Sequence, residues 1–245
     1  FEHNLLAMIA LANDAGIPVI LIRPPSNLRN SPPFKSQHRG DISADEIIEW
    51  ENETEAAHEL YTNDLKLAVN HLERAISLDD RFAATHYELA KCYELLGNRS
   101  AAHRHFMRAL DEDICPLRMI PALITAMKQV AETTRTPLIN AHALLEKDSR
   151  LHILGNDQLV DHIHPSIEGH QRLAHAIQEQ MRAMELIDPV DDWIQKRNAS
   201  YKEHRQSLSA AYFAAARRAL HGLNEWAAGR AEGAPVDSRP SPNKK

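Results

Sequence analysis

Asp161 and His164 are the residues of this sequence whose types and spacing point most directly to chemistry. They lie in the run Asp161-His162-Ile163-His164-Pro165. An aspartate three residues before a histidine on a turn can place its carboxylate against the imidazole Nδ1, which fixes the tautomer. The carboxylate then stabilises the imidazolium that forms when Nε2 accepts a proton. The pattern predicts the acid and the base of a hydrolytic triad.

Two other interpretations of the same residues stay open. In the first, Asp161 only caps a polar turn and His164 is solvated, which is the commoner outcome when spacing is the only evidence. In the second, Asp161, His162 and His164 bind a metal ion, although no second cluster of ligands accompanies them in the sequence. The sequence also has no glycine-rich phosphate loop. We expect neither a metal nor a cofactor.

A serine that would complete the triad is not recognisable from its neighbours. No serine of the chain follows Gly-Asp, and none lies in a Gly-x-Ser-x-Gly turn. Because loss of the nucleophile leaves little residual rate, we expect this chain alone to be an inactive fragment. The sequence opens on Phe1, within a helical pattern and without a methionine. A signal peptide or anchor could precede it, so no compartment is predicted.

Composition narrows the classes of partner. The 245 residues allow two structural units. The 34 acidic and 28 basic residues give a net charge of -6 and form no basic stripe, so we expect no nucleic acid partner. Cys92 and Cys115 are far apart, which argues against a disulfide framework. No apolar run approaches the ~20 residues of a membrane span.

Two helix-then-strand units provide the elements that would position the site. A helical pattern over residues 5–12 stops at Ala15-Gly16, and an apolar run over 17–22 reads as a buried strand. A helix over 120–133 precedes a second candidate strand over 136–140. Repeated units of this kind predict a parallel sheet, whose ligands bind at the carboxyl ends of its strands. The loop after the first strand therefore offers Ser26 and Asn27 as substrate-binding residues.

The segment between these units, from about residue 44 to 109, has a helical pattern with an internal period. Four positions recur 34 residues later, and 34 residues is the period of the tetratricopeptide repeat (TPR). The pairs are Ala68 with Ala102, Ala75 with Ala109, Ile76 with Leu110, and Asp79 with Asp113. We expect one clear repeat from Ala83, ended in its first helix by Gly97, and one degenerate repeat before it.

The final block resembles that of a known family. Asp161-x-x-His164-Pro165, with Gly169 in the next helical turn and then Leu173-Ala174, is similar to the last conserved block of the SGNH hydrolases, the GDSL-type esterases and lipases. The helix and strand of residues 1–22 and the loop Pro25-Ser26-Asn27-Leu28 resemble the segments after that family's third block. The resemblance covers roughly residues 1–39 and 117–182.

The resemblance implies a fold and an activity. It implies a three-layer, flavodoxin-like α/β fold that lacks its N-terminal strands and carries an inserted all-α TPR module. It also implies that His164 activates a serine which attacks an acyl or acetyl ester of a carbohydrate or lipid, with a protein partner held by the repeats. The expected units are 1–40 and 114–186 for the α/β domain, 44–113 for the repeats, 187–228 for C-terminal helices and 229–245 for a disordered tail.

Other polar residues receive less specific interpretations. Arg118 precedes the second helix–strand unit, and we expect it at the surface, with an approach to the site as the alternative. His71, His86, His103 and His105 lie at helical positions of the repeats, where packing or surface roles are expected. A different function for the whole chain also stays open, namely a non-catalytic TPR scaffold that binds a protein partner.

Overall fold

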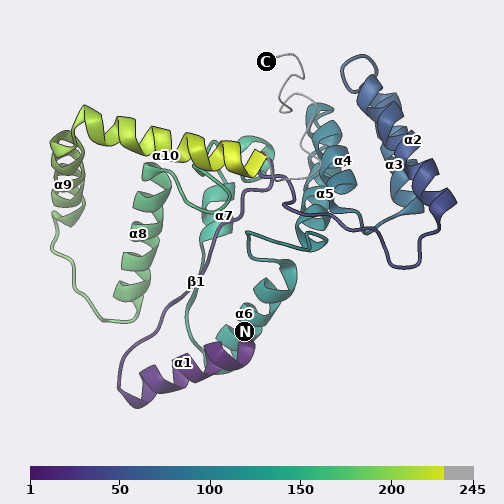
Figure 1. Ribbon diagram of the computed structural model, residues 1–245. Coiled ribbons are helices and arrows are strands. Elements are labelled where there is room, and N and C mark those ends of the chain that lie inside the picture. Colours follow the sequence, from purple (N-terminus) through teal and green to yellow (C-terminus); the bar gives the residue numbers. More distant parts are fainter. Residues whose placement is uncertain (229–245) are drawn as a thin grey trace.

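The computed structural model describes residues 1–228, in which helices predominate (Figure 1). Within residues 1–228, ten α-helices hold 62% of the residues, and there are only two strands, of three residues each. The predicted three-layer α/β fold is therefore wrong. Pro18 and Pro137, which lack the N–H that a ladder needs, lie in the runs predicted as strands, and the strands begin only after them.

The helices and strands follow one another along the chain with mostly short connections. Their order is α1 (Glu2–Asp14), β1 (Leu21–Arg23), α2 (Ala44–Leu60), α3 (Leu65–Leu78), α4 (Ala83–Leu95), α5 (Arg99–Asp111), α6 (Pro121–Thr134), β2 (Leu138–Asn140), α7 (Ala141–Glu146), the 3-10 turn η1 (Arg150–His152), α8 (Ile167–Ala183), α9 (Trp193–Ser207) and α10 (Ala210–Ala228).

The first structural unit combines α1, β1, α6 and β2. The two strands are parallel, with Leu21 opposite Leu138. Ile9 of α1 and Val130 of α6 pack with Leu21 into one apolar cluster. As predicted, α1 ends just before Gly16, which has a φ of +69° and accommodates the left-handed turn that other residues disfavour. This unit holds the carboxyl ends of both strands together.

Helices α2 to α5 form two antiparallel hairpins that contain the best-packed part of the molecule. Ala68, Ala75 and Ala102 are completely buried, so the helices approach closely where the internal period places alanine. Asp64 and Asn98 cap α3 and α5 through their side chains. Small residues and caps at recurring positions explain why this segment is helical throughout.

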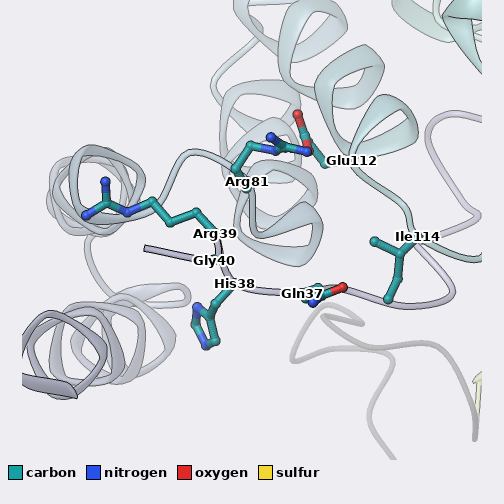
Figure 2. A pocket seen from close by; sticks show the side chains of 7 residues that line it. All are labelled: Gln37, His38, Arg39, Gly40, Arg81, Glu112 and Ile114. Carbon is teal, nitrogen blue, oxygen red and sulfur yellow. The ribbon is translucent and has the colours of Figure 1, made fainter. Parts of the chain in front are cut away.

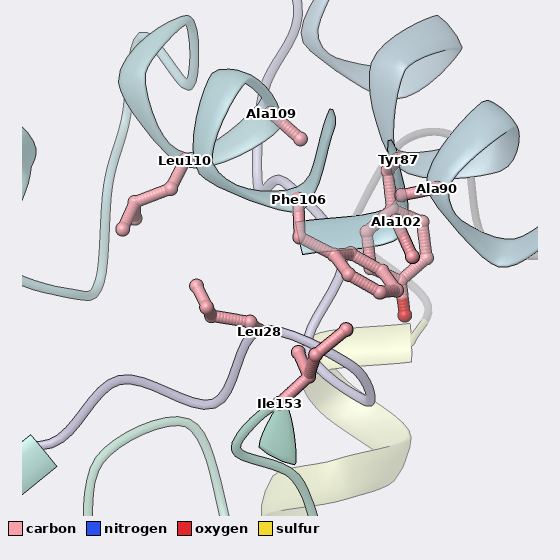
Figure 3. Close-up of a cluster of buried hydrophobic side chains, with 8 residues drawn as sticks. All are labelled: Leu28, Tyr87, Ala90, Ala102, Phe106, Ala109, Leu110 and Ile153. Atoms are coloured by element: carbon pink, nitrogen blue, oxygen red, sulfur yellow. The ribbon is translucent and has the colours of Figure 1, made fainter. Parts of the chain in front are cut away.

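The core of the second hairpin includes residues from outside it. Figure 3 shows Phe106 and Tyr87 facing Leu28 and Ile153, which come from the connection after β1 and from the segment after η1. The ring centroids of Tyr87 and Phe106 lie 5.5 Å apart, and the Tyr87 hydroxyl donates to the Arg29 carbonyl at 2.8 Å. The helical hairpins and the loops around the candidate site thus share one core.

Two aspartates attach the connection between β1 and α2 to the hairpins. Asp113 accepts hydrogen bonds from the backbone N–H groups of Phe34 and Lys35, at 2.8 and 3.1 Å. Asp79 lies 2.7 Å from His38 Nδ1 and also accepts from the Arg81 N–H. These are the aspartates that recur at the 34-residue offset, and each follows the second helix of a hairpin. The two aspartates at equivalent positions of the internal period therefore both bind the connection between β1 and α2 to the hairpins.

In Figure 1, α8 and α9 lie on the far side of the β1–β2 unit from the hairpins, and α10 extends from α9 back toward the hairpins. Gly169 is the only buried residue of α8, and α9 has none. Within residues 1–228, no helix combines the length and the hydropathy of a membrane span. The predicted tail of residues 229–245 lies outside the described residues.

Candidate active site

The segment that carries Asp161 and His164 is a short closed loop between η1 and α8. The Val160 N–H donates to the His164 carbonyl at 2.9 Å, so the chain reverses between these two residues. Leu159, at the start of the loop, is buried against Leu145 and Leu154. Apolar packing of Leu159 therefore holds the start of the loop in place, while His164, at its other end, has an exposed side chain.

Asp161 binds His164 through both of its carboxylate oxygens. Oδ2 lies 2.7 Å from His164 Nδ1, and Oδ1 accepts the backbone N–H groups of Ile163 and His164 at 2.9 and 2.7 Å. Because the carboxylate accepts from Nδ1, that nitrogen carries the proton, and Nε2 is left with its lone pair. The hydrogen bond expected from the three-residue spacing is present.

The two partners differ sharply in exposure. The side chain of Asp161 is 6% exposed, whereas that of His164 is 62% exposed. Among the described residues, none makes a hydrogen bond with His164 Nε2. The imidazole is thus held by a buried carboxylate on one side and presents a basic nitrogen to solvent on the other.

The electrostatics keep Asp161 ionised. Partial burial tends to raise the pKa of Asp161, but the N–H groups of His164 and Ile163 and the His164 side chain outweigh it, so the pKa is lowered. Burial lowers the pKa of the neighbouring His162 and favours its neutral form, although Asp161 acts in the opposite direction. An ionised carboxylate against Nδ1 of His164 can hold the ring and stabilise it when Nε2 accepts a proton, as a general base requires.

Residues at the start of α8 fix the direction of the loop. Ser166 caps the helix by accepting the Gly169 N–H at 3.1 Å. A Cβ on Gly169 would lie 2.8 Å from Cβ of Pro165, so only glycine lets the first turn of α8 approach so closely. Local steric crowding therefore explains why this position of the motif is a glycine.

Asn27 joins the candidate loop to the connection after β1. It is 1% exposed, and its Nδ2 donates to the Asp161 carbonyl at 2.9 Å and to Asn156 Oδ1 at 2.7 Å. The Asn27 N–H donates to the His162 carbonyl at 2.9 Å. Asn27 thus supports the backbone on which Asp161 sits. Its predicted role in substrate binding stays a prediction.

Ser26, the other predicted substrate-binding residue, is also enclosed. It is 2% exposed, and its backbone N–H donates to His142 Nδ1 at 3.1 Å. Its hydroxyl oxygen is buried and has no hydrogen-bond partner among the described residues. The structure places Ser26 directly before the residue that holds the Asp161 loop. A contact between Ser26 and substrate is likewise untested.

Arg118 was expected at the surface, and that prediction is wrong. Its guanidinium is buried and donates to the carbonyls of Asn27 and Ser31 at 2.8 and 2.7 Å, with Asp113 3.7 Å away. Burial lowers the pKa of Arg118, against the influence of Asp113. Arg118 therefore reaches the backbone that supports the site, as the alternative interpretation had it. Neither Arg118 nor Asn156 has a local sequence signal for this role.

The histidines of the hairpins have packing roles rather than a common site. His86 is buried, and its Nδ1 lies 3.2 Å from His105 Nδ1, with the two rings stacked. His71 pairs with Glu53 at 2.6 Å, and His103 lies 3.7 Å from Glu146. Within the described part of the chain, no three His, Cys, Asp or Glu side chains are arranged to hold a metal ion.

A hollow in the surface lies beside the hairpins (Figure 2), and neither Asp161 nor His164 lines it. It is a cavity of about 200 Å³ between the β1–α2 connection and the end of α5. Its charged groups are already paired, Arg39 with Glu46 and Arg81 with Glu112, at 2.7 and 2.6 Å. The cavity therefore offers no unpaired charge to a ligand, and we assign it no role.

Comparison of the sequence with protein families, with curated proteins and with solved structures gave no match. The geometry of the Asp161–His164 loop and the motif resemblance are therefore the indications of function that this chain offers.

Proposed function

We propose that Asp161 and His164 are the acid and the base of a serine esterase that cleaves an acyl or acetyl ester, with a serine from outside residues 1–245. The observation that carries the proposal is the 2.7 Å contact between the buried Asp161 carboxylate and Nδ1 of an exposed imidazole. The same pair on a simple polar turn would not require a buried carboxylate. The similarity of the block to the SGNH hydrolases favours the same reaction.

The pair performs defined proton transfers in this reaction. His164 Nε2 takes the proton of the serine hydroxyl while the serine oxygen attacks the ester carbonyl, and Asp161 stabilises the resulting imidazolium. The imidazolium returns the proton to the leaving alcohol as the acyl-enzyme forms. Water then gives a proton to His164 and attacks the acyl-enzyme. The imidazolium returns that proton to the serine oxygen as the bond to the acyl group breaks and the acid is released.

The test uses the longest protein whose coding sequence contains residues 1–245, with p-nitrophenyl acetate as substrate. His164→Ala and Asp161→Asn should each lower kcat/KM by roughly 10³–10⁴-fold, because the serine loses its oriented base. His162→Ala is the matched control, since it removes a neighbouring imidazole that has no place in the triad. It should retain most of the activity.

Two results would overturn the proposal. One is equal activity in all three variants and the unmodified protein. The other is a coding region without a Gly-Asp-Ser block upstream of Phe1.

A second candidate function is an interaction scaffold built on α2 to α5. The 34-residue recurrence of Asp79 and Asp113, and the alanines that let the hairpins pack closely, favour TPR-like repeats that bind a protein partner. Serine-dependent hydrolysis that disappears in His164→Ala would exclude a purely non-catalytic scaffold. The enzyme is the preferred proposal because a scaffold has no need of the Asp161–His164 geometry.

A further inference from the structure

An open apolar cavity lies among α8, α9 and α10, and its lining begins at the first residue of α8. Its volume is about 490 Å³, within the range of small-molecule sites. Ile167, Gln171 and Ala174 form one wall at helical spacing along α8, and Ile167 follows His164 by three residues. The cavity therefore starts at the helix turn that the catalytic loop leads into.

The three helices enclose this cavity where a packed apolar core would be expected. Tyr201, Leu208 and Phe213 line it from α9 and α10, and all three are only half-buried. Ile167 and Tyr212, also at the cavity, are 48% and 56% exposed. Protein interiors are normally close-packed, and a gathered set of exposed apolar side chains marks a binding surface. The helices surround a space of the right chemistry for a hydrocarbon.

Positive charge accompanies the apolar walls. Arg205 lines the cavity and makes no ion pair with any described residue, and His170 and His204 lie beside the same space. None of the lining residues that the structure describes is acidic. A guanidinium without a carboxylate partner next to an apolar wall complements a molecule with a hydrocarbon body and a carboxylate head.

We propose that this cavity binds the acyl group of the ester substrate and, after cleavage, the apolar carboxylic acid that is released. The substrate class rests on the proposed esterase function, and the link to His164 is Ile167, a lining residue three positions after it in the chain. The body of the acyl group contacts Tyr201, Leu208 and Phe213. The carboxylate of the free acid pairs with Arg205.

Binding is measured on residues 1–245 by fluorescence titration with cis-parinaric acid, which needs no catalysis. Ala174→Trp fills the cavity from an exposed helix position and should weaken probe binding at least tenfold. Ala183→Trp, at an exposed position of α8 outside the cavity, is the matched control and should bind like the unmodified chain. Circular dichroism of both variants checks that α8 is retained.

Competition separates the charged head from the hydrocarbon. Decanoate should displace the probe from the unmodified chain, and Arg205→Gln should weaken that displacement about tenfold while leaving displacement by decanol unchanged. Equal loss for both competitors would overturn the role of Arg205. No saturable binding, or binding unaffected by Ala174→Trp, would overturn the cavity as an acyl site. A concentration-dependent dimer that Ala174→Trp abolishes would show that a second copy fills it, and would also overturn the proposal.

The proposed acyl site and the proposed esterase reaction can be tested separately. If the protein binds the probe saturably and Ala174→Trp weakens that binding, but no ester is hydrolysed, the cavity is supported as a binding site and the esterase proposal is excluded. Hydrolysis of p-nitrophenyl acetate without any probe binding would do the reverse. When both hold, Ala174→Trp should lower kcat/KM for p-nitrophenyl decanoate much more than for p-nitrophenyl acetate.

Discussion

The two helical regions, α2 to α5 and α8 to α10, have similar amounts of helix but very different packing. In α2 to α5, alanines and aromatic residues are fully buried, and loops from elsewhere in the chain complete the core. In α9 no residue is buried, and the apolar side chains of α8 to α10 surround an open cavity. Helix formation alone therefore does not give a helical region a core.

The difference follows from what each sequence supplies at its helix contacts. The hairpins place alanine at closely approaching positions and fill the remaining space with residues such as Phe106. The C-terminal helices instead have Tyr201, Tyr212 and Phe213 around an open cavity, where none of the three rings is fully buried. We expect α2 to α5 to determine stability and α8 to α10 to respond to ligands. The following predictions test that division.

The largest expected difference is between two phenylalanines. Phe106→Ala should lower the free energy of unfolding by about 3–5 kcal/mol, because Phe106 is fully buried against Tyr87 and Leu28. Phe213→Ala, in the open region, should cost less than about 1 kcal/mol. Urea unfolding followed by circular dichroism measures both values. A cost for Phe213→Ala as large as that for Phe106→Ala would contradict the comparison.

The second prediction concerns acid and the hairpin core. Burial, with His86 and Arg104 nearby, lowers the pKa of His105 from 6.5 to about 4. Between these pH values the unfolded chain binds a proton that the folded chain excludes, so stability falls as pH drops from about 6.5 to 4. The loss should be roughly 2 kcal/mol, allowing for partial exposure of the ring.

The variant that checks this is His105→Leu, compared with His170→Leu at an exposed position of α8. Unfolding free energies at pH 7 and pH 4.5 should differ less in His105→Leu than in the unmodified protein. His170→Leu should retain the full pH dependence. An unchanged slope in His105→Leu would assign the acid sensitivity to other groups.

The smallest expected effect comes from a single buried carboxylate. Asp79→Ala should cost roughly 1–2 kcal/mol, because the Arg81 N–H and the His38 ring lose a completely buried acceptor. Asp192→Ala, which breaks an exposed pair with Lys196 in the C-terminal region, should have no measurable effect. Thermal unfolding of both variants is the measurement. Equal shifts in melting temperature would remove the distinction between the regions.

Local features of the sequence predicted local structure well. The stop of α1 before Gly16 follows from the conformational freedom of glycine, and the contact between Asp161 and His164 follows from their spacing on a turn. The helical nature of residues 44–111 follows from periodicity and caps. Each of these depends on interactions between residues near one another in the chain.

Features that depend on distant residues were missed or wrong. The parallel sheet was inferred from two apolar runs and the three-layer fold from the resemblance of the motif, but each run forms a strand of only three residues and the sheet has only these two strands within residues 1–228. Burial of Arg118 depends on carbonyls of Asn27 and Ser31, about ninety positions away. No pattern within one segment specifies such partners, because the arrangement arises only when the segments pack together.

The hairpins α2 to α5 cannot simply be deleted from the chain, because they share contacts with the connection after β1. These contacts involve Leu28, Arg29 and Tyr87. Leu28 lies inside the hairpin core, Tyr87 donates to the Arg29 carbonyl, and the Arg29 guanidinium pairs with Glu94 at 3.1 Å. Excision of α2 to α5 would expose this leucine and remove Glu94, which leaves Arg29 with only the more distant carboxylate of Asp157, at 3.6 Å. Protein engineers who want the Asp161–His164 loop on a smaller scaffold would have to redesign this seam first, whereas α9, which has no buried residue, could be exchanged at little structural cost.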